Sequence, residues 1–290
     1  MTRFSRLQAG LALLWALSLL VGWRPFVDTL VLSSRDQAYT HILLILPISA
    51  ALITQEWRVL RTMFAPSVLA GSLFLAVSAV AAGFASVWSA SLPFDVQLTI
   101  KMSALVVWWI GAFVLCLGSR TAKLALFPLL MLFCMVPLPN VAVDWIVVLL
   151  QQGSAWSARA LFVVFGIPIA QDGFLLTIPG LTVQVAQECS SIRSSSMLLV
   201  TTLVLAQVLL ISPWRKILAV SIAVPLSIAK NGLRIFVIAM LGTRVDPGYL
   251  TGRFHHQGGI IFFSIALTCM FALLWLLRRG DGISQEMRAN

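Results

Sequence analysis

The sequence has very few charged residues. Only 10% of its 290 residues are Asp, Glu, Lys or Arg, whereas 60% are hydrophobic and the mean hydropathy is +0.97. A soluble domain with so few charges could not cover its surface with polar groups. Apolar runs of about 16 to 25 residues recur along the chain, each long enough to cross a hydrocarbon core of about 30 Å. The sequence therefore predicts an integral membrane protein.

Acidic residues and cysteines are also scarce, and neither kind forms a pattern. The ten acids are dispersed, which disfavours an enzyme of polysaccharide assembly that would need paired carboxylates. Three of the four cysteines lie in apolar segments, where a free thiol behaves as a small hydrophobe, and their spacing indicates no disulfide framework. Cys189 differs, because it lies in a polar stretch at the edge of a helix.

The net charge of +10 comes from basic residues scattered as pairs between apolar segments. This is the pattern of topology-setting charges rather than of a phosphate-binding stripe, so we expect no nucleic-acid partner. We interpret the first apolar segment as an uncleaved helix, because no small-residue cleavage site follows it. The predicted fold is an all-α polytopic membrane protein with about eight transmembrane helices, near residues 7–23, 39–55, 66–90, 102–119, 122–138, 195–213, 216–242 and 257–277.

The basic residues also predict the orientation of the chain. If the N-terminus is cytoplasmic, that side holds 11 basic and three acidic residues, a balance of +8, against +2 for the remainder. This asymmetry favours a cytoplasmic location for both termini, which an even number of spans requires.

The longest segment between predicted spans, residues 139–194, then lies outside the cytoplasm. Residues 141–165 form an amphipathic stretch, interrupted by polar residues such as Asp144 and Gln151, that suits a helix at the membrane interface or lining a cavity. A ninth buried helix is the alternative. Residues 166–185 contain Asp-Gly and Pro-Gly turns and an alternating run, which predict a small extracytoplasmic β element before span six.

Three polar clusters interrupt the apolar background. They cover residues 187–196 before span six, 230–234 within span seven and 253–259 before span eight. Because spans six and eight enter from outside and span seven runs outward, this topology brings Cys189, Arg234, His255 and His256 to one membrane face. The sequence therefore predicts a site at the outer face that combines a thiol, a guanidinium and an imidazole.

These groups suit acyl transfer through a thioester. A free thiol has a pKa of about 8.5, and a neighbouring imidazole or cation raises its thiolate fraction. In this interpretation His255 takes the proton of Cys189 and returns it to the leaving amine, while Arg234 stabilises the oxyanion. Simpler roles stay open, since Arg234 could reach the headgroups or pair with Glu188, and the histidines could be interfacial residues.

Other classes of protein make different predictions. A transporter would place its polar residues near span centres and show related halves, whereas these clusters lie at one edge. A non-catalytic assembly factor of exopolysaccharide export would keep the same residues for structural reasons. Two adjacent histidines without nearby carboxylate or thiol ligands do not indicate a metal site, and we expect no cofactor.

The clusters resemble three motifs of the exosortase/archaeosortase family. Its members carry Cys-Ser-Gly-Ile-Arg-Ser before a membrane helix, Asn-x-x-Arg-Ile in the next helix and His-x-x-x-Gly-x-x-x-Phe at the start of the one after. Here the motifs are residues 189–194, 231–235 and 255–263, and the family's glycine is Ser191. The spacing to Gly259 and Phe263 favours His255 as the base, with His256 as the alternative.

The resemblance implies a membrane-embedded cysteine protease or transpeptidase in the bacterial inner membrane, with its active site at the periplasmic face. Its partners would be membrane lipid and secreted proteins whose C-terminal tail combines a short motif such as Pro-Glu-Pro, a transmembrane helix and a basic cluster. We expect one membrane domain over 1–290, with a core at about 130–275 and accessory spans in 1–129. The resemblance assigns catalysis to Cys189, Arg234 and His255, with support from Glu188, Ser190, Arg193 and Asn231.

Overall fold

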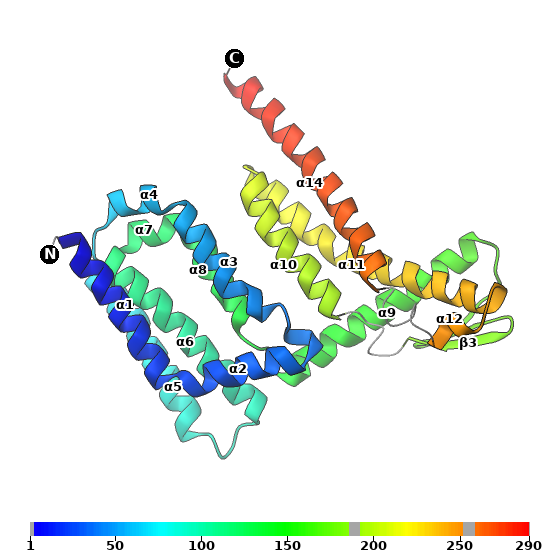
Figure 1. Ribbon diagram of the computed structural model, residues 1–290, viewed down its shortest axis with the longest axis horizontal. Helices are drawn as coiled ribbons and strands as arrows, with labels where there is room; N and C mark the ends of the chain where they lie inside the picture. Colours follow the sequence, from blue (N-terminus) through cyan, green and yellow to red (C-terminus); the bar gives the residue numbers. More distant parts are fainter. Residues whose placement is uncertain (1–2, 186–191, 252–258, 290) are drawn as a thin grey trace. The chain divides into compact units, whose positions relative to one another are not determined.

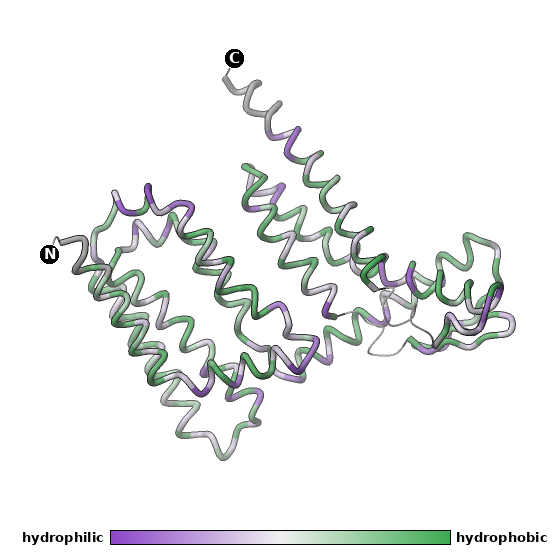
Figure 2. The backbone as a smooth tube through the Cα atoms, in the orientation of Figure 1, coloured by the Kyte–Doolittle hydropathy of each residue, from purple (hydrophilic) through white to green (hydrophobic). Residues whose placement is uncertain are grey.

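The computed structural model describes residues 3–185, 192–251 and 259–289 (Figure 1). The chain divides into two compact units, Met1–Val143 and Asp144–Asn290. Figure 2 shows hydrophobic residues along the helices of both units, with hydrophilic residues concentrated at helix ends and connections. Apart from one small sheet, the described chain is helical, as the sequence predicts.

The first unit consists of helices joined by short connections. Its elements are α1 (Arg3–Val21), α2 (Trp23–Arg35), η1 (Gln37–Tyr39), α3 (Ile42–Gln55), α4 (Trp57–Leu60), η2 (Arg61–Met63), α5 (Val68–Val87), α6 (Phe94–Leu117), α7 (Ser119–Leu124), α8 (Leu126–Met131) and η3 (Leu132–Met135). Helix α6 contacts α1, α2, α5 and η3 and contributes many of the unit's buried residues. It packs closely on α5, where a Cβ atom on Gly71 would lie 2.5 Å from the Cα of Leu115.

The predicted fifth span, residues 122–138, does not form one continuous helix. It is divided into α7, α8 and η3 because Pro128, in the first turn of α8, cannot donate a hydrogen bond to the preceding turn. The chain nevertheless runs from one end of the unit to the other. Thr121 Oγ1 donates to Met63 O at 3.1 Å at one end, and Thr99 Oγ1 donates to Pro137 O at 2.8 Å at the other.

The length of α6 gives the distance between the two ends of this broken segment. Between Thr99 and Leu117, α6 covers about 27 Å at 1.5 Å per residue, close to the thickness of a hydrocarbon core. The hydroxyl of Ser49 on α3 donates to Pro128 O at 2.9 Å, within the first turn of α8. The segment therefore runs the length of the unit as two short helices, a 3-10 turn and an extended end, and it does not form the single membrane-spanning helix predicted over 122–138.

Among the described residues, seven helices are long and apolar enough to cross a membrane, or up to eight if the pair α1 and α2, bent by 75°, forms one span. The bend lies at Gly22, because Pro25 cannot donate a hydrogen bond to the carbonyl of Val21. The amphipathic stretch after Pro139 forms one 25-residue helix, α9 (Asn140–Val164), which meets the same criteria for a span. A multi-pass membrane protein is thus confirmed.

The second unit combines long helices with the predicted β element. Its further elements are β1 (Ala170–Asp172), β2 (Leu175–Ile178), β3 (Leu181–Gln184), α10 (Ile192–Leu209), α11 (Pro213–Arg244), α12 (Gly248–Thr251) and α14 (Gly259–Ala289). The strands form one antiparallel sheet in the order β1-β2-β3. Gly173 and Gly180 occupy the two hairpin turns with φ of +56° and +81°, a region that favours glycine.

Helices α10, α11 and α14 pack against one another around small and aliphatic side chains such as Ala219, Ala266 and Met270. The ends of α11 and α14 are joined by an ion pair of 2.9 Å between Arg215 Nη1 and Asp281 Oδ1. The same carboxylate accepts the backbone N–H of Ile211 at 2.9 Å. The basic pairs at 215–216 and 278–279 thus lie at one end of this bundle.

A second core lies where the sheet packs against α9 and α11. Leu176, Ile178 and Val185 from the sheet contact Phe162 of α9 and Phe236 of α11. The two rings lie 4.9 Å apart in an edge-to-face arrangement. This core fixes the sheet on the C-terminal half of α11.

Candidate active site

Helix α11 extends well beyond the partner helix α10. The two helices run antiparallel, since Lys216 Nζ donates to Gln207 Oε1 at 2.9 Å near one end and Lys230 Nζ contacts Ser194 Oγ near the other. Helix α11 has 32 residues and is about 48 Å long, more than a hydrocarbon core requires. The part beyond Lys230 is therefore available to form a site with α9, the sheet and α12.

Small residues allow α9 and α11 to cross closely. A Cβ atom on Gly232 would lie 2.3 Å from Ser157 Oγ and 2.9 Å from the backbone N of Ala158. A Cβ atom on Gly153 would lie 2.9 Å from Ile228 Cδ1. Membrane helices use such small residues to bring their backbones together. The crossing places the polar side chains of α9 next to the motif residues of α11.

Two amides are buried at this crossing. Asn231 is 1% exposed, and its Nδ2 donates to Ser154 Oγ at 2.8 Å. One turn away, Gln151 is also buried and its Nε2 donates to Val185 O at 3.0 Å. Buried amides need such partners, because an unsatisfied polar group is costly in an apolar interior. Helix α9 thereby holds both α11 and the end of β3.

A cavity of about 310 Å³ lies between β3 and α11. Strand β3 and Val185 line one side of it, and Leu250 of α12 contributes to the wall. The α11 side consists of residues spaced three and four apart, which places them on one helical face: Asn231, Arg234, Ile235, Ile238 and Ala239. The volume falls in the range of small-molecule and peptide subsites.

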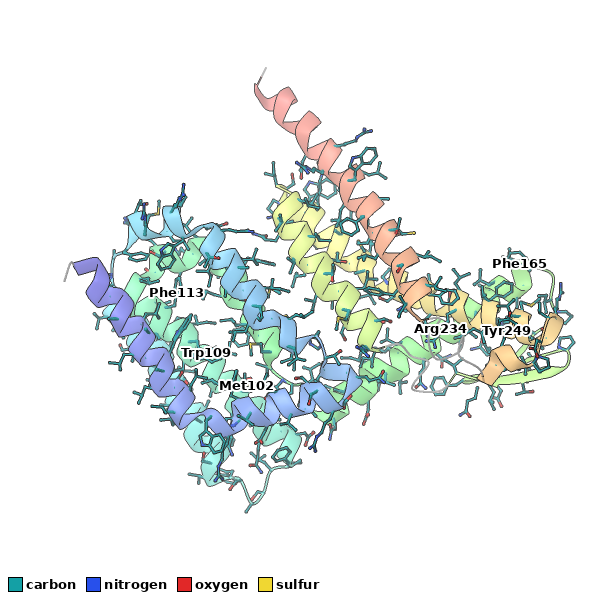
Figure 3. The ribbon with its side chains drawn as sticks, viewed as in Figure 1. Met102, Trp109, Phe113, Phe165, Arg234 and Tyr249 are labelled. Atoms are coloured by element: carbon teal, nitrogen blue, oxygen red, sulfur yellow. The ribbon has the colours of Figure 1, made fainter. Side chains whose placement is uncertain are left out.

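Among the described residues that line the cavity, Arg234 alone is charged (Figure 3). It is half-buried and lies one turn beyond Lys230 on the same face of α11. A guanidinium presents a planar array of donors that matches a carboxylate or a developing oxyanion. The cavity therefore combines a cationic donor group, a buried amide and a largely apolar wall.

The structure brings two of the eight predicted site residues together. Asn231 and Arg234 both line the cavity, whereas Arg193 is exposed in the first turn of α10 and does not. The others lie outside the described residues: Glu188, Cys189, Ser190, His255 and His256. In sequence, Cys189 follows Val185 of the cavity wall by four residues and precedes the first residue of α10 by three.

Several contributions to the cavity were not predicted from the sequence. The spacing of three between Gln151 and Ser154 could have shown that they are neighbours on one face of α9, but not that Val185 and Asn231 are their partners. The contact between Lys230 and Ser194 has a similar signal, because a buried lysine in a span needs a partner. The position of β3 beside α11 has no local signal. Within the described ranges, no three His, Cys, Asp or Glu side chains gather as metal ligands would.

Comparison with known proteins agrees with the three motifs. The family model described as transmembrane exosortase matches residues 33–272, which include most of both units. Neither the curated proteins nor the solved structures that were compared with the chain gave a match. The family match covers the cavity, all three polar clusters and most of the spans of the first unit. The chain therefore belongs to the transmembrane exosortase family.

Proposed function

We propose that this protein is a membrane-embedded cysteine transpeptidase that cleaves C-terminal sorting signals of secreted proteins. One observation carries the proposal. Arg234 and Asn231 line a cavity whose opposite wall includes Val185, and the motif cysteine follows Val185 by four residues in sequence. A nucleophile placed so near in sequence to a cavity with an oxyanion-stabilising group suits acyl transfer.

The proposed reaction has two steps. First, the thiolate of Cys189 attacks the scissile carbonyl carbon, the guanidinium of Arg234 stabilises the oxyanion, and the C–N bond breaks. His255, or His256 in its place, accepts the thiol proton and donates it to the leaving amine. In the second step an acceptor amine or water attacks the thioester, the C–S bond breaks and the thiol is restored. Glu188, Ser190 and Arg193 support the site.

The proposed substrates carry a short motif such as Pro-Glu-Pro, a transmembrane helix and a basic cluster at their C-terminus. Such a helix can reach the enzyme by diffusion in the bilayer. The exposed basic residues of the first unit support a cytoplasmic N-terminus, and we propose that the C-terminus lies on the same side. Arg61 in η2 and Arg120 in α7 lie at the same end, where Ala65 N donates to Leu117 O at 3.2 Å. The active site would then face the periplasm of the inner membrane.

We propose one membrane domain, in which the later part of the chain performs the chemistry and the earlier spans are accessory. The cavity and all three motifs lie within Asp144–Asn290. Helix α6 and its neighbours contribute none of the residues that line the cavity. Substitutions in the first unit that preserve its folding should therefore leave the chemical step unchanged.

The test is co-expression with a secreted reporter that carries a Pro-Glu-Pro-type tail. The C-terminal mass of the reporter is measured with the wild-type enzyme, with Cys189→Ala and with the control Cys269→Ala, whose thiol lies on the exposed face of α14. We expect the tail to be lost with the wild type and with Cys269→Ala, and retained with Cys189→Ala. The new mass distinguishes hydrolysis from transfer to an acceptor. Equal processing by Cys189→Ala would refute the proposed nucleophile.

A further inference from the structure

The cavity is bounded by a strand edge rather than by side chains alone. In the described chain β3 is an edge strand, because β2 pairs with it on one side and no described strand pairs with it on the other. All four residues of β3 line the cavity. A strand edge presents backbone donors and acceptors at regular spacing, and it can pair with another extended chain.

The register shows which backbone groups face away from the sheet. Val185 N donates to Phe174 O at 2.9 Å, and β3 pairs antiparallel with β2. In an antiparallel pair, directly opposed residues alternate between exchanging both hydrogen bonds and exchanging none. Because Val185 bonds to β2, the alternation means that Val183 and Leu181 also bond to β2. Gln184 and Thr182 therefore direct their N–H and C=O groups to the outer edge of β3.

The edge is fixed rigidly beside the candidate catalytic residues. Val185 is 1% exposed in the core formed with α9 and α11, and its carbonyl accepts the bond from Gln151. Arg234 lies in the same cavity, and none of the described residues that line it is acidic. An extended peptide beside Gln184 would thus be held next to Arg234, with its side chains facing an apolar wall that includes Ile235 and Ile238.

We propose that the extended segment before the substrate's transmembrane helix binds by adding a fourth strand to the sheet, along the outer edge of β3. This inference rests on the proposed function and identifies how the same site recognises its substrate. Main-chain hydrogen bonds to Thr182 and Gln184 provide affinity that does not depend on sequence, and the α11 wall selects side chains. Strand addition also keeps the scissile peptide extended and accessible to the nucleophile.

Pairing with β3 restricts where proline can occur in the substrate segment. In a strand, successive residues direct their N–H and C=O groups to opposite edges, so only every second substrate residue bonds to β3. Proline lacks the N–H and is tolerated only at the positions that face away. Two prolines separated by one residue satisfy this condition, because the residue between them can exchange both bonds with Thr182 or Gln184.

The enzyme side of the proposal is tested with proline substitutions at the outer edge. Thr182→Pro and Gln184→Pro each remove one outward N–H without removing a bond to β2. Gln171→Pro is the matched control, because Gln171 occupies the equivalent outward position on β1, at the opposite edge of the sheet. We expect each β3 variant to slow tail removal about tenfold and the control to change it less than twofold. Equal effects at both edges would overturn the proposal.

The position of the substrate segment is tested by disulfide cross-linking in an inactive variant, so that the result does not depend on catalysis. In a Cys189→Ala background, Gln184→Cys or the control Gln171→Cys is combined with single cysteines along the reporter's extended segment. Cross-strand neighbours lie about 5 Å apart, within reach of a disulfide after oxidation. We expect cross-links from position 184 at every second substrate residue, and none above background from position 171.

The outcomes separate the two proposals. Cross-links with a period of two, together with no cysteine-dependent cleavage by the wild type, would keep strand addition and reject the peptidase. Cleavage by the wild type with cross-links of no period, or equal from both edges, would keep the peptidase and reject strand addition. Absence of both cross-links and cleavage would reject both.

Discussion

The two units bury different kinds of polar groups, although both consist mainly of apolar helices. Among the described residues, every buried polar side chain of the first unit is a hydroxyl: Ser18, Thr29, Ser33, Ser49, Ser78 and Thr121. The second unit also buries two amides, an ammonium and a carboxylate: Gln151, Asn231, Lys230 and Asp281. The first unit thus forms its helical fold without a buried charge among the described residues, whereas the second unit buries charged groups.

The two kinds of group differ in whether they need a partner from another element, although Ser49 and Ser78 also donate to carbonyls of neighbouring helices. A hydroxyl can donate to the preceding turn of its own helix, as Ser33 Oγ does to Leu30 O at 2.8 Å. Amides and charges need partners from other elements, as Asn231 has in Ser154 and Asp281 has in Arg215. A charged residue within a span costs about 2.5–3.5 kcal/mol on insertion scales. Asn231 is buried in the wall of the cavity, and burial of such a group beside a cavity is typical of a functional site.

The largest effect is expected from replacing the Arg234 guanidinium in the cavity. Arg234→Lys keeps the charge but loses the planar donors, so we expect processing of the reporter tail to fall by about 100-fold or more. The comparison is Lys101→Arg, in the first unit, where Lys101 Nζ lies 3.5 Å from Gln97 Oε1. That variant should stay within twofold of the wild type. Pulse-chase rates, normalised to the enzyme in the membrane, make the comparison, and near-normal rates for Arg234→Lys would remove Arg234 from the oxyanion role.

A second comparison concerns helix crossings. Gly232→Ala places a Cβ atom against Ser157, so we expect a loss of about 1–3 kcal/mol in stability and slower processing. Gly83→Ala, in α5 of the first unit, meets no atom within 4 Å and should be neutral or stabilising by up to about 1 kcal/mol. Thermal unfolding of the detergent-solubilised proteins measures both. A neutral Gly232→Ala would show that the α9–α11 crossing is looser than described.

The smallest effect should distinguish structural from functional hydroxyls. Ser78 Oγ donates to Ala104 O at 2.6 Å, and Ser154 Oγ accepts from Asn231. We expect alanine at either position to lower stability by about 1 kcal/mol, the net value of one hydrogen bond. Only Ser154→Ala should also slow processing per folded molecule, because it releases a motif residue. If both variants process the reporter equally, the amide network has no part in positioning.

Much of the fold followed from the sequence because its signals are local. Apolar length located the membrane helices, and the Asp-Gly and Pro-Gly turns located the sheet, with Gly173 and Gly180 at positive φ as those turns require. The break near Pro128 could have been predicted because proline lacks a backbone N–H, but the segment was assigned as one helix from the length of its apolar run. Residues 141–165 were predicted as an amphipathic stretch suited to a helix, and the structure forms that helix over Asn140–Val164, with the length and hydropathy of a membrane span.

The site was less accessible from the sequence, since it depends on contacts between distant elements. The motif residues Asn231 and Arg234 were identified, and both line the cavity. The partner Ser154 is 77 residues from Asn231 in sequence, and no local pattern connects them. The position of β3 depends on packing of Val185 against α9 and α11, which a turn-and-strand pattern does not encode.

If Cys189 is the nucleophile, it forms a thioester with the substrate, and this intermediate can be trapped. Wild-type enzyme and reporter are quenched in acid during turnover, and the covalent enzyme–reporter species is analysed by mass spectrometry before and after neutral hydroxylamine, which cleaves thioesters. We predict an adduct on Cys189 that hydroxylamine releases, that is absent from Cys189→Ala and that persists in Cys269→Ala. An adduct of equal abundance in Cys189→Ala, or turnover by that variant, would contradict the account.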